Sequence, residues 1–211
     1  TLRSYREDIG NPAFYESTLY DYAMAIPQST RMVEVMVRMN MVELIKGGCT
    51  TGLIYGGGFS QFQAHTAGEL GWRAYIGGDV RAGNPLSVTG IWYSPDGHSL
   101  EYSFDEESGL KRLDEAVAFI QEYDGAYDGR IHGILAPTQT MTCTPDILKK
   151  VRQKADALGV GITIHGSESM MEFESCLRMF GKTPVQFMAE HGMVGSDVVV
   201  GHCYLIQGHS N

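Results

Sequence analysis

Five short, largely apolar segments, each separated from the next by helical sequence, restrict most strongly how this chain can fold. We expect strands at residues 50–55, 73–78, 131–136, 160–164 and 197–201, because each is a short apolar run bounded by turn signals. Strands that alternate with helices build parallel sheets. The sequence therefore predicts an α/β protein with a parallel sheet, and periodicity alone leaves open whether that sheet is open or closed into a barrel.

Capping signals predict where the later helices begin and end. Thr144 is placed to be an N-cap, Pro145 the first helical residue and Gly159 the stop. Thr183 and Pro184 open a capping box that also contains Gln186, and Gly192 is expected to end that short helix. The long connection between residues 79 and 107 predicts an elaborated loop at the substrate pocket, with a small hairpin formed by residues 88–93 and 100–104.

Composition restricts the function classes. The chain has 211 residues, 43% of them hydrophobic and 19% charged, which suits one folded domain. The formal net charge is -9 and no cluster of Lys or Arg occurs, so neither a nucleic acid nor a membrane is expected as a partner. The four cysteines form no C-x-x-C motif, which favours reduced thiols and a cytoplasmic location.

Two histidines stand where expected strands end. His165 follows the apolar run of residues 162–164, with Glu168 one turn later, and His202 follows residues 198–200. The carboxyl ends of parallel strands form the mouth in which barrel and doubly wound proteins build their sites. Neighbouring strands lie about 5 Å apart, so both imidazoles can reach one cavity. A histidine pair with a carboxylate can help to hold a divalent metal and move a proton.

Each of these residues also has a structural interpretation. A strand-end histidine can be a hydrogen-bonded structural residue, and Glu168 can cap the helix that follows it. The remaining histidines are expected to be structural or at the surface, although His209 could approach the pocket; they are His65, His98, His132, His191 and His209.

An ordered set of motifs resembles the amidohydrolase superfamily, in particular its branch of triazine and ammeline chlorohydrolases, hydroxyatrazine hydrolases and cytosine or guanine deaminases. The motifs are MVELIKGGCTT at 41–51, GELGWRA at 68–74, HGSES at 165–169, GKTP at 181–184 and GHC at 201–203. The resemblance implies a (β/α)8 TIM-type barrel, of which residues 1–211 form the central part of one domain with roughly strands 2–6.

The resemblance also implies a reaction. One divalent metal, zinc in preference to iron, would supply a hydroxide that attacks a small N-heterocycle and removes an amine or a halide. His165 matches the fifth-strand metal ligand, Glu168 the acid/base that transfers the proton, and His202 the sixth-strand histidine that orients water or the tetrahedral intermediate. Gln139 matches a position at which some triazine-hydrolase-like members carry glutamine, and we expect it to contact the substrate.

The first-strand H-x-H pair and the eighth-strand aspartate of the superfamily are not in this sequence. Strands 2–6 alone would leave two unpaired edges, so we expect further native segments, a homo-oligomer or another chain to complete the barrel. Two other readings stay open. A catalytically silent fragment or scaffold subunit would retain no metal, and an open-sheet protein of the flavodoxin type would show a different strand order.

Overall fold

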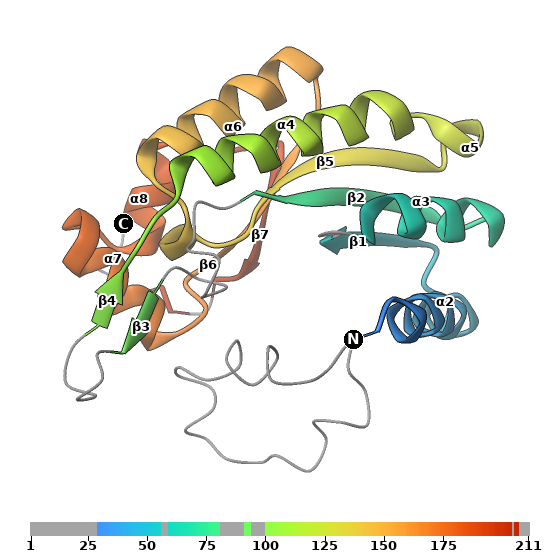
Figure 1. Cartoon of the computed structure of the whole chain (residues 1–211), viewed down its shortest axis with the longest axis horizontal. Coiled ribbons are helices and arrows are strands. Elements are labelled where there is room, and N and C mark those ends of the chain that lie inside the picture. Colours follow the sequence, from blue (N-terminus) through green and yellow to red (C-terminus); the bar gives the residue numbers. More distant parts are fainter. Residues whose placement is uncertain (1–28, 56–58, 81–90, 94–99, 204, 207–211) are drawn as a thin grey trace, which may run out of the picture.

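The computed structural model describes residues 29–55, 59–80, 91–93, 100–203 and 205–206 of the chain. Strands and helices alternate as expected (Figure 1). The elements are α2 (Thr30–Lys46), β1 (Thr51–Tyr55), α3 (Ser60–Glu69), β2 (Arg73–Val80), β3 (Ile91–Tyr93), β4 (Leu100–Tyr102), α4 (Glu106–Tyr123), α5 (Ala126–Gly129), β5 (Ile131–Pro137), η3 (Thr140–Thr142), α6 (Pro145–Leu158), β6 (Ile162–Gly166), α7 (Met170–Phe180), α8 (Pro184–Glu190) and β7 (Val198–His202).

The main sheet is parallel and its strand order follows the chain. The order is β1-β2-β5-β6-β7, and every neighbouring pair is parallel. An open doubly wound sheet reverses its order at a switch point, and this sheet has no reversal. The flavodoxin-type alternative is therefore wrong, and the described strands form part of a TIM-type barrel, as predicted.

One contact shows that the sheet is curled. Tyr55, at the end of β1, and Thr163 of β6 share a hydrogen bond of 2.9 Å between their hydroxyl oxygens. Two strands lie between β1 and β6 in the sheet. On a flat sheet these two strands would be about 14 Å apart, because neighbouring strands are about 4.8 Å apart. The hydroxyls can meet only because the sheet bends into an arc with both side chains on its inner side.

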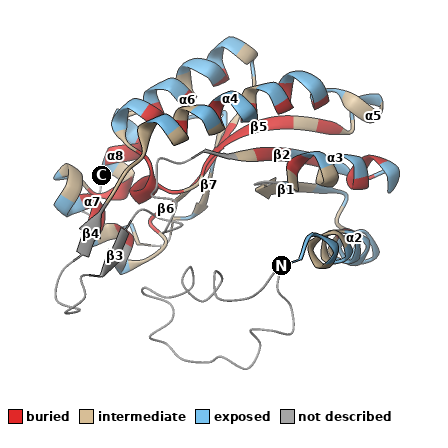
Figure 2. Ribbon diagram, in the orientation of Figure 1, coloured by how far each residue is buried: buried red, intermediate tan, exposed pale blue. Residues whose placement is uncertain are grey.

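Burial alternates along β2. Ala74 and Ile76 are buried, whereas Tyr75 between them is 43% exposed. The buried side faces the helices, and Figure 1 shows α4 and α6 lying over the sheet. Two glycines let α4 approach closely: a Cβ at Gly78 would lie 2.8 Å from Ala116 Cβ, and one at Gly133 would lie 2.6 Å from Ile120 Cγ1. The core thus lies between the sheet and its helices (Figure 2).

The core is aliphatic in the main. Its largest fully buried side chains include Ile76, Leu113, Ile131, Leu135, Ile147, Leu148, Ile162, Ile164, Phe187 and Met193. All four cysteines are free thiols; Cys143 and Cys176 are buried, and Cys49 and Cys203 are partly buried. Among the helices described, none is both long enough and apolar enough to cross a bilayer.

The predicted ends of α6 and the predicted start of α8 are confirmed. Thr144 caps α6 through its side chain, Pro145 is the first helical residue, and Gly159 ends the helix with φ 69°. Thr183 and Gln186 form the expected capping box at α8. That helix ends at Glu190, two residues before the predicted stop.

Three local features differ from the sequence prediction or extend it. The short α5 and η3 elements were not predicted, and α5 contains Tyr127 and Asp128 with positive φ. The predicted hairpin is present as β3 paired antiparallel with β4, while residues 88–90 of that prediction lie outside the described residues. The hairpin pairs Ile91–Tyr93 with Leu100–Tyr102 and stands apart from the main sheet.

Candidate active site

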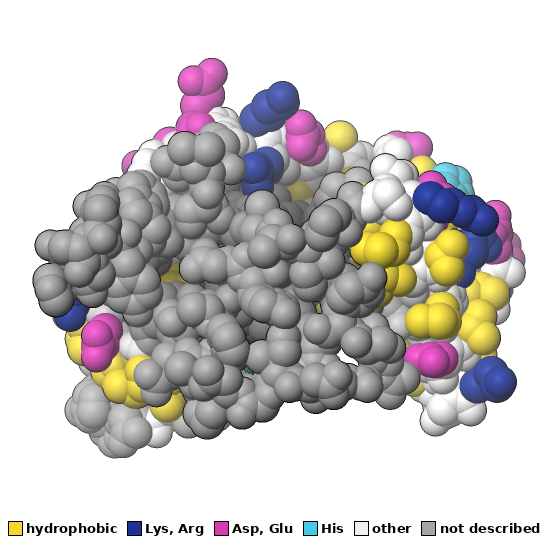
Figure 3. Space-filling model, turned by 60° about the horizontal axis from the view of Figure 1, so that its bottom comes forward, with side chains coloured by type: hydrophobic (Ala, Val, Ile, Leu, Met, Phe, Trp, Pro, Cys, Tyr) yellow, Lys and Arg dark blue, Asp and Glu magenta, His cyan; other side chains and the backbone are white. Residues whose placement is uncertain are grey.

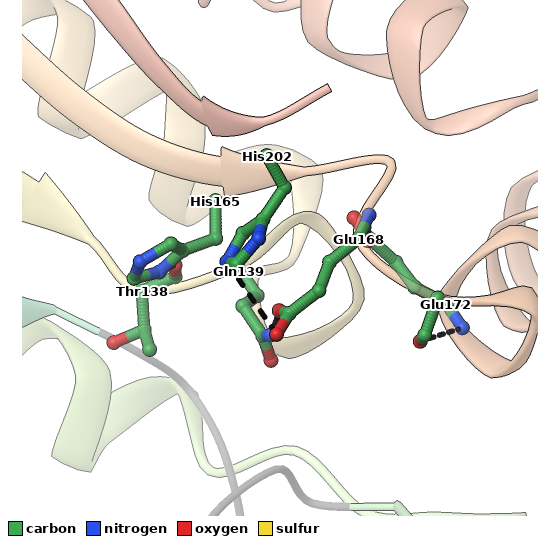
Figure 4. A network of polar contacts seen from close by, with 7 residues as sticks. Thr138, Gln139, His165, Glu168, Glu172 and His202 are labelled. Carbon is green, nitrogen blue, oxygen red and sulfur yellow. Dashed lines mark hydrogen bonds and ion pairs between the residues drawn. The ribbon is translucent and has the colours of Figure 1, made fainter. Parts of the chain in front are cut away.

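His165 and His202 lie side by side at the carboxyl ends of β6 and β7, as predicted. Their ring centroids are 5.2 Å apart with an angle of 41° between the ring planes. The register places His165 opposite Gly201, and Gly166 opposite His202. Figure 4 shows the two imidazoles next to Gln139 and Glu168. The predicted meeting of two imidazoles at one end of the sheet is therefore confirmed.

The orientation of His165 follows from its strand and from its neighbours. Thr163 and His165 are two residues apart in β6, so their side chains share the inner face of the sheet. The ring lies over Gly201, where a Cβ would be only 2.7 Å from His165 Cδ2. On its other side the ring stacks on Tyr55, with centroids 4.2 Å apart.

A backbone carbonyl selects the tautomer of His165. Nδ1 lies 2.8 Å from the carbonyl oxygen of Thr138, which can only accept a hydrogen bond. The proton is therefore on Nδ1, and Nε2 carries a free lone pair. Metal-binding histidines in proteins have this arrangement. The hydrogen bond donated by one ring nitrogen fixes the tautomer and the ring orientation, so that the other nitrogen can bind the metal.

Glu168 points toward His202 and Gln139. Its Oε1 lies 3.4 Å from His202 Nε2, an ion pair when the imidazole is protonated. Its Oε2 accepts a hydrogen bond of 2.5 Å from Gln139 Nε2. The alternative in which Glu168 caps the following helix does not match these contacts, because Ser169 is the N-cap of α7 and accepts from the amide of Glu172.

Three consecutive residues after β5, Thr138, Gln139 and Thr140, each form a hydrogen bond with a different side chain of the site. The Thr138 carbonyl accepts from both the amide and Nδ1 of His165. Gln139 donates to Glu168, and the Thr140 hydroxyl donates to Glu172. The loop after β5 thus fixes the loop after β6, and the geometry of the site depends on two neighbouring strands rather than on one.

Gln139 is only 1% exposed, and its side-chain amide is directed at Glu168. The Gln139 side chain also caps η3, in a capping box with Thr142. The expected contact between Gln139 and substrate stays a prediction.

Three of the five described non-glycine residues with positive φ lie at the ends of β6 and β7, and the other two are in α5. Ser167 has φ 54°, His202 has φ 67° and Cys203 has φ 56°. Non-glycine residues adopt such angles at a cost of about 1 kcal/mol or more and do so mainly where a site requires it. The two strands are tied together here, because the amide of Cys203 donates to the carbonyl of Gly166 at 3.0 Å.

The other described histidines have structural partners, as predicted. His65 forms hydrogen bonds with the hydroxyls of Tyr127 and Tyr123. His132 forms one with Asp124, and His191 forms one with the carbonyl of Phe187. His98 and His209 lie outside the described residues.

Three site residues were not predicted from the sequence: Thr138, which acts through its carbonyl, Tyr55 and Glu172. Thr138 meets His165 through the pairing of the strand ends, and Tyr55 meets it through the curl of the sheet, and no local sequence pattern records either. For Glu172 a signal existed, because Ser169 and Glu172 have the S-x-x-E spacing of a capping box.

Within the residues that the structure describes, no group of three or more His, Cys, Asp or Glu side chains is arranged to hold a metal ion. Nε2 of His165 can nevertheless serve as one metal ligand, because the Thr138 carbonyl fixes the tautomer that leaves a lone pair on this nitrogen.

Comparison with known proteins places this site in a family. The Amidohydrolase family matches residues 10–210. A 5-methylthioadenosine/S-adenosylhomocysteine deaminase from Moorella thermoacetica is 27% identical over 206 residues, covering 96% of this chain and 41% of the relative. An enzyme of the same name from Desulfitobacterium hafniense is 40% identical over 96 residues, covering 46% of this chain and 22% of the relative.

Solved structures share the fold. A triazine hydrolase from Arthrobacter aurescens superposes with a TM-score of 0.72 and 16% identity, covering 94% of this chain and 45% of the other. An adenosine deaminase from Xanthomonas campestris, solved with bound zinc, gives a TM-score of 0.65 and 17% identity over 86% of this chain and 36% of the other.

The chain spans less than half the length of each of these four proteins. The family match nevertheless covers almost all of it, and the curled parallel sheet agrees with the fold of the solved structures. The chain belongs to the amidohydrolase family.

Proposed function

We propose that this chain provides part of the active site of a metal-dependent deaminase that removes an amine from a small N-heterocycle by hydrolysis. The observation that supports this proposal best is the meeting of His165, Glu168 and His202 at the carboxyl ends of β6 and β7. Some relatives are named as deaminases of 5-methylthioadenosine and S-adenosylhomocysteine, or of 5′-deoxyadenosine, and these names suggest an adenine nucleoside as substrate.

His165 would hold the metal through Nε2, as one of several ligands. A bound zinc or iron ion lowers the pKa of a water molecule toward 7 and so makes a nucleophile available at neutral pH. Zinc is favoured, because two of the solved relatives that share the fold were determined with zinc.

Glu168 would carry the proton between the attacking water and the leaving amine. Its carboxylate is partly buried, with 19% of the side chain exposed, and it is held by Gln139 on one oxygen. The other oxygen faces His202 Nε2 at 3.4 Å. His202, with 37% of its side chain exposed, can therefore orient the water or the oxygen that develops on the ring carbon.

Ammonia release by the intact protein tests the proposal. Zinc-loaded protein is incubated with 5′-methylthioadenosine, S-adenosylhomocysteine and 5′-deoxyadenosine, and with atrazine to test for chloride release. We expect ammonia from at least one nucleoside. The substitution Glu168→Gln should lower kcat about 100-fold or more, because general acid and base catalysis contributes about 10²–10⁴-fold. The control Glu174→Gln changes an exposed carboxylate of α7 and should leave kcat unaltered.

Metal analysis separates the enzyme from its alternative, a silent scaffold of the same fold. About one zinc or iron ion per chain after purification without chelators supports the enzyme. Protein that binds no metal and releases neither ammonia nor chloride would show that the proposed function is wrong and would favour the scaffold.

A further inference from the structure

Glu172 is a buried carboxylate that the proposed reaction does not use. It lies in the first turn of α7 and is 0% exposed. A buried carboxylate is costly unless hydrogen bonds compensate for the lost water. Here Oε2 accepts a bond of 2.7 Å from the amide of Glu168, and Oε1 accepts from the Thr140 hydroxyl. The amide of Ser167 also donates to this carboxylate.

These contacts differ from those of an ordinary helix cap. In a capping box, the glutamate at this position would accept from the amide of the N-cap residue, which is Ser169. Glu172 instead reaches one and two residues further back, to Glu168 and Ser167, and across to the loop after β5. It therefore joins two loops of the site rather than only closing the end of its own helix.

The turn that Glu172 holds is strained. Ser167 has φ 54°, an angle that a residue with a Cβ adopts only when its surroundings enforce it. The direction of the Glu168 side chain depends on this turn, because Glu168 follows Ser167 directly. An acceptor fixed between the two amides opposes any relaxation of the turn.

We propose that Glu172 is a positioning residue, which holds residues 167 and 168 so that the Glu168 carboxylate stays between Gln139 and His202. This inference rests on the proposed function for the role of Glu168 in turnover. The contacts themselves do not depend on it, and they can be tested without a substrate.

The protonation of Glu172 indicates which substitution is conservative. Burial raises the pKa of this carboxyl to about 7, although the Thr140 hydroxyl and the amides of Glu168 and Ser167 lower it. Near neutral pH both forms are populated, and each presents an oxygen to the amide of Glu168. Glutamine also presents such an oxygen and can bond Thr140 with its amide group, whereas leucine keeps a similar volume and offers no acceptor.

Kinetics on the zinc-loaded intact protein form the first test. Glu172→Leu should lower kcat about 100-fold with KM changed by less than about threefold, because a displacement near 1 Å can cost that much in rate. Glu172→Gln should restore kcat to within about tenfold of the starting protein. Glu174→Leu and Glu174→Gln, on the same helix but exposed, are the matched controls and should not change kcat.

Hydrogen exchange at the amides of residues 167 and 168 forms the second test and needs no activity. Glu172→Leu should accelerate exchange at these two amides by about tenfold or more, with Glu172→Gln close to the starting protein. If Glu172→Leu does not fold, Thr140→Val removes one partner of the carboxylate and should produce a smaller effect of the same kind.

Unchanged exchange at both amides in the folded variants would overturn the inference, as would normal kcat in Glu172→Leu. Faster exchange in a protein that deaminates nothing would instead refute the proposed function and leave the structural role of Glu172 standing.

Discussion

Gly201 is the residue whose missing side chain makes room for His165. A methyl group at this position would lie 2.7 Å from Cδ2 of the ring and 3.5 Å from Nε2. The ring has little freedom to move away, because Tyr55 stacks on it and Thr138 holds Nδ1. Any added atom at residue 201 must therefore turn the imidazole or shift β7.

Gly201→Ala should consequently weaken metal binding more than it weakens the fold. We expect the zinc affinity of the intact protein to fall about 10–100-fold, the range found when groups that orient a metal ligand are altered. The free energy of unfolding should fall by about 1–3 kcal/mol from overpacking. Competition with a zinc chelator measures the first quantity and urea denaturation the second.

Gly133→Ala is the matched control for that experiment. Its methyl group would meet Ile120 of α4 at 2.6 Å, a clash of similar severity on the helix side of the sheet. It should lower stability by a similar amount and leave zinc affinity unchanged. Equal losses of zinc affinity in both variants would show that Gly201 acts only through general stability.

At the scale of elements, helix ends could be predicted, and contacts made by the curl of the sheet could not. The ends of α6 and the start of α8 follow from local chemistry, since Thr144, Gly159 and Thr183 act on amides and carbonyls a few residues away. The strand-end position of His165 could be inferred in the same way. Its contact with Tyr55 could not, because it joins residues 110 positions apart through the curl of the sheet.

The capping box at α8 has a consequence beyond its own helix. Thr183 is only 3% exposed, and its hydroxyl accepts from the amide of Gln186 at 3.3 Å. The helix that it opens packs Met188 against Gly166 of β6, beside His165. The position of α8 therefore supports the end of the strand that carries the site.

Thr183→Ala should lower the free energy of unfolding by about 1–2 kcal/mol, because a buried cap hydroxyl is lost and the amide of Gln186 loses its partner. Thr183→Ser keeps the hydroxyl and should cost about 0.5 kcal/mol or less. Urea denaturation followed by circular dichroism gives both values. Equal stability of the alanine and serine variants would mean that the hydroxyl contributes nothing to the cap.

At the scale of the whole molecule, the described chain leaves two kinds of apolar surface open. On the inner side of the sheet, Tyr75 and Val199 are 43% and 52% exposed. On α2, the stripe Val35, Met39 and Val42 is exposed at helical spacing. Figure 3 shows hydrophobic side chains gathered at the end of the molecule that carries α2 and α3.

Surfaces of this kind drive association in water, and β1 and β7 are the edge strands of the main sheet within the part of the chain that the structure describes. We therefore expect the 211-residue chain on its own to elute above the mass of a 23.2 kDa monomer in size-exclusion chromatography with light scattering. The double substitution of Met39→Lys and Val42→Lys should reduce this association, since charge interrupts the stripe on α2.

Gln153→Lys and Lys154→Gln are the controls, because they change charge at exposed positions of α6 away from both apolar surfaces. Neither should alter the mass distribution. A folded, monodisperse monomer for the unsubstituted chain at tens of micromolar would contradict the argument, and it would mean that these apolar side chains are covered within the chain. If association persists in the double variant, the sheet is its source instead, where Val199 and the β7 edge lie next to His202.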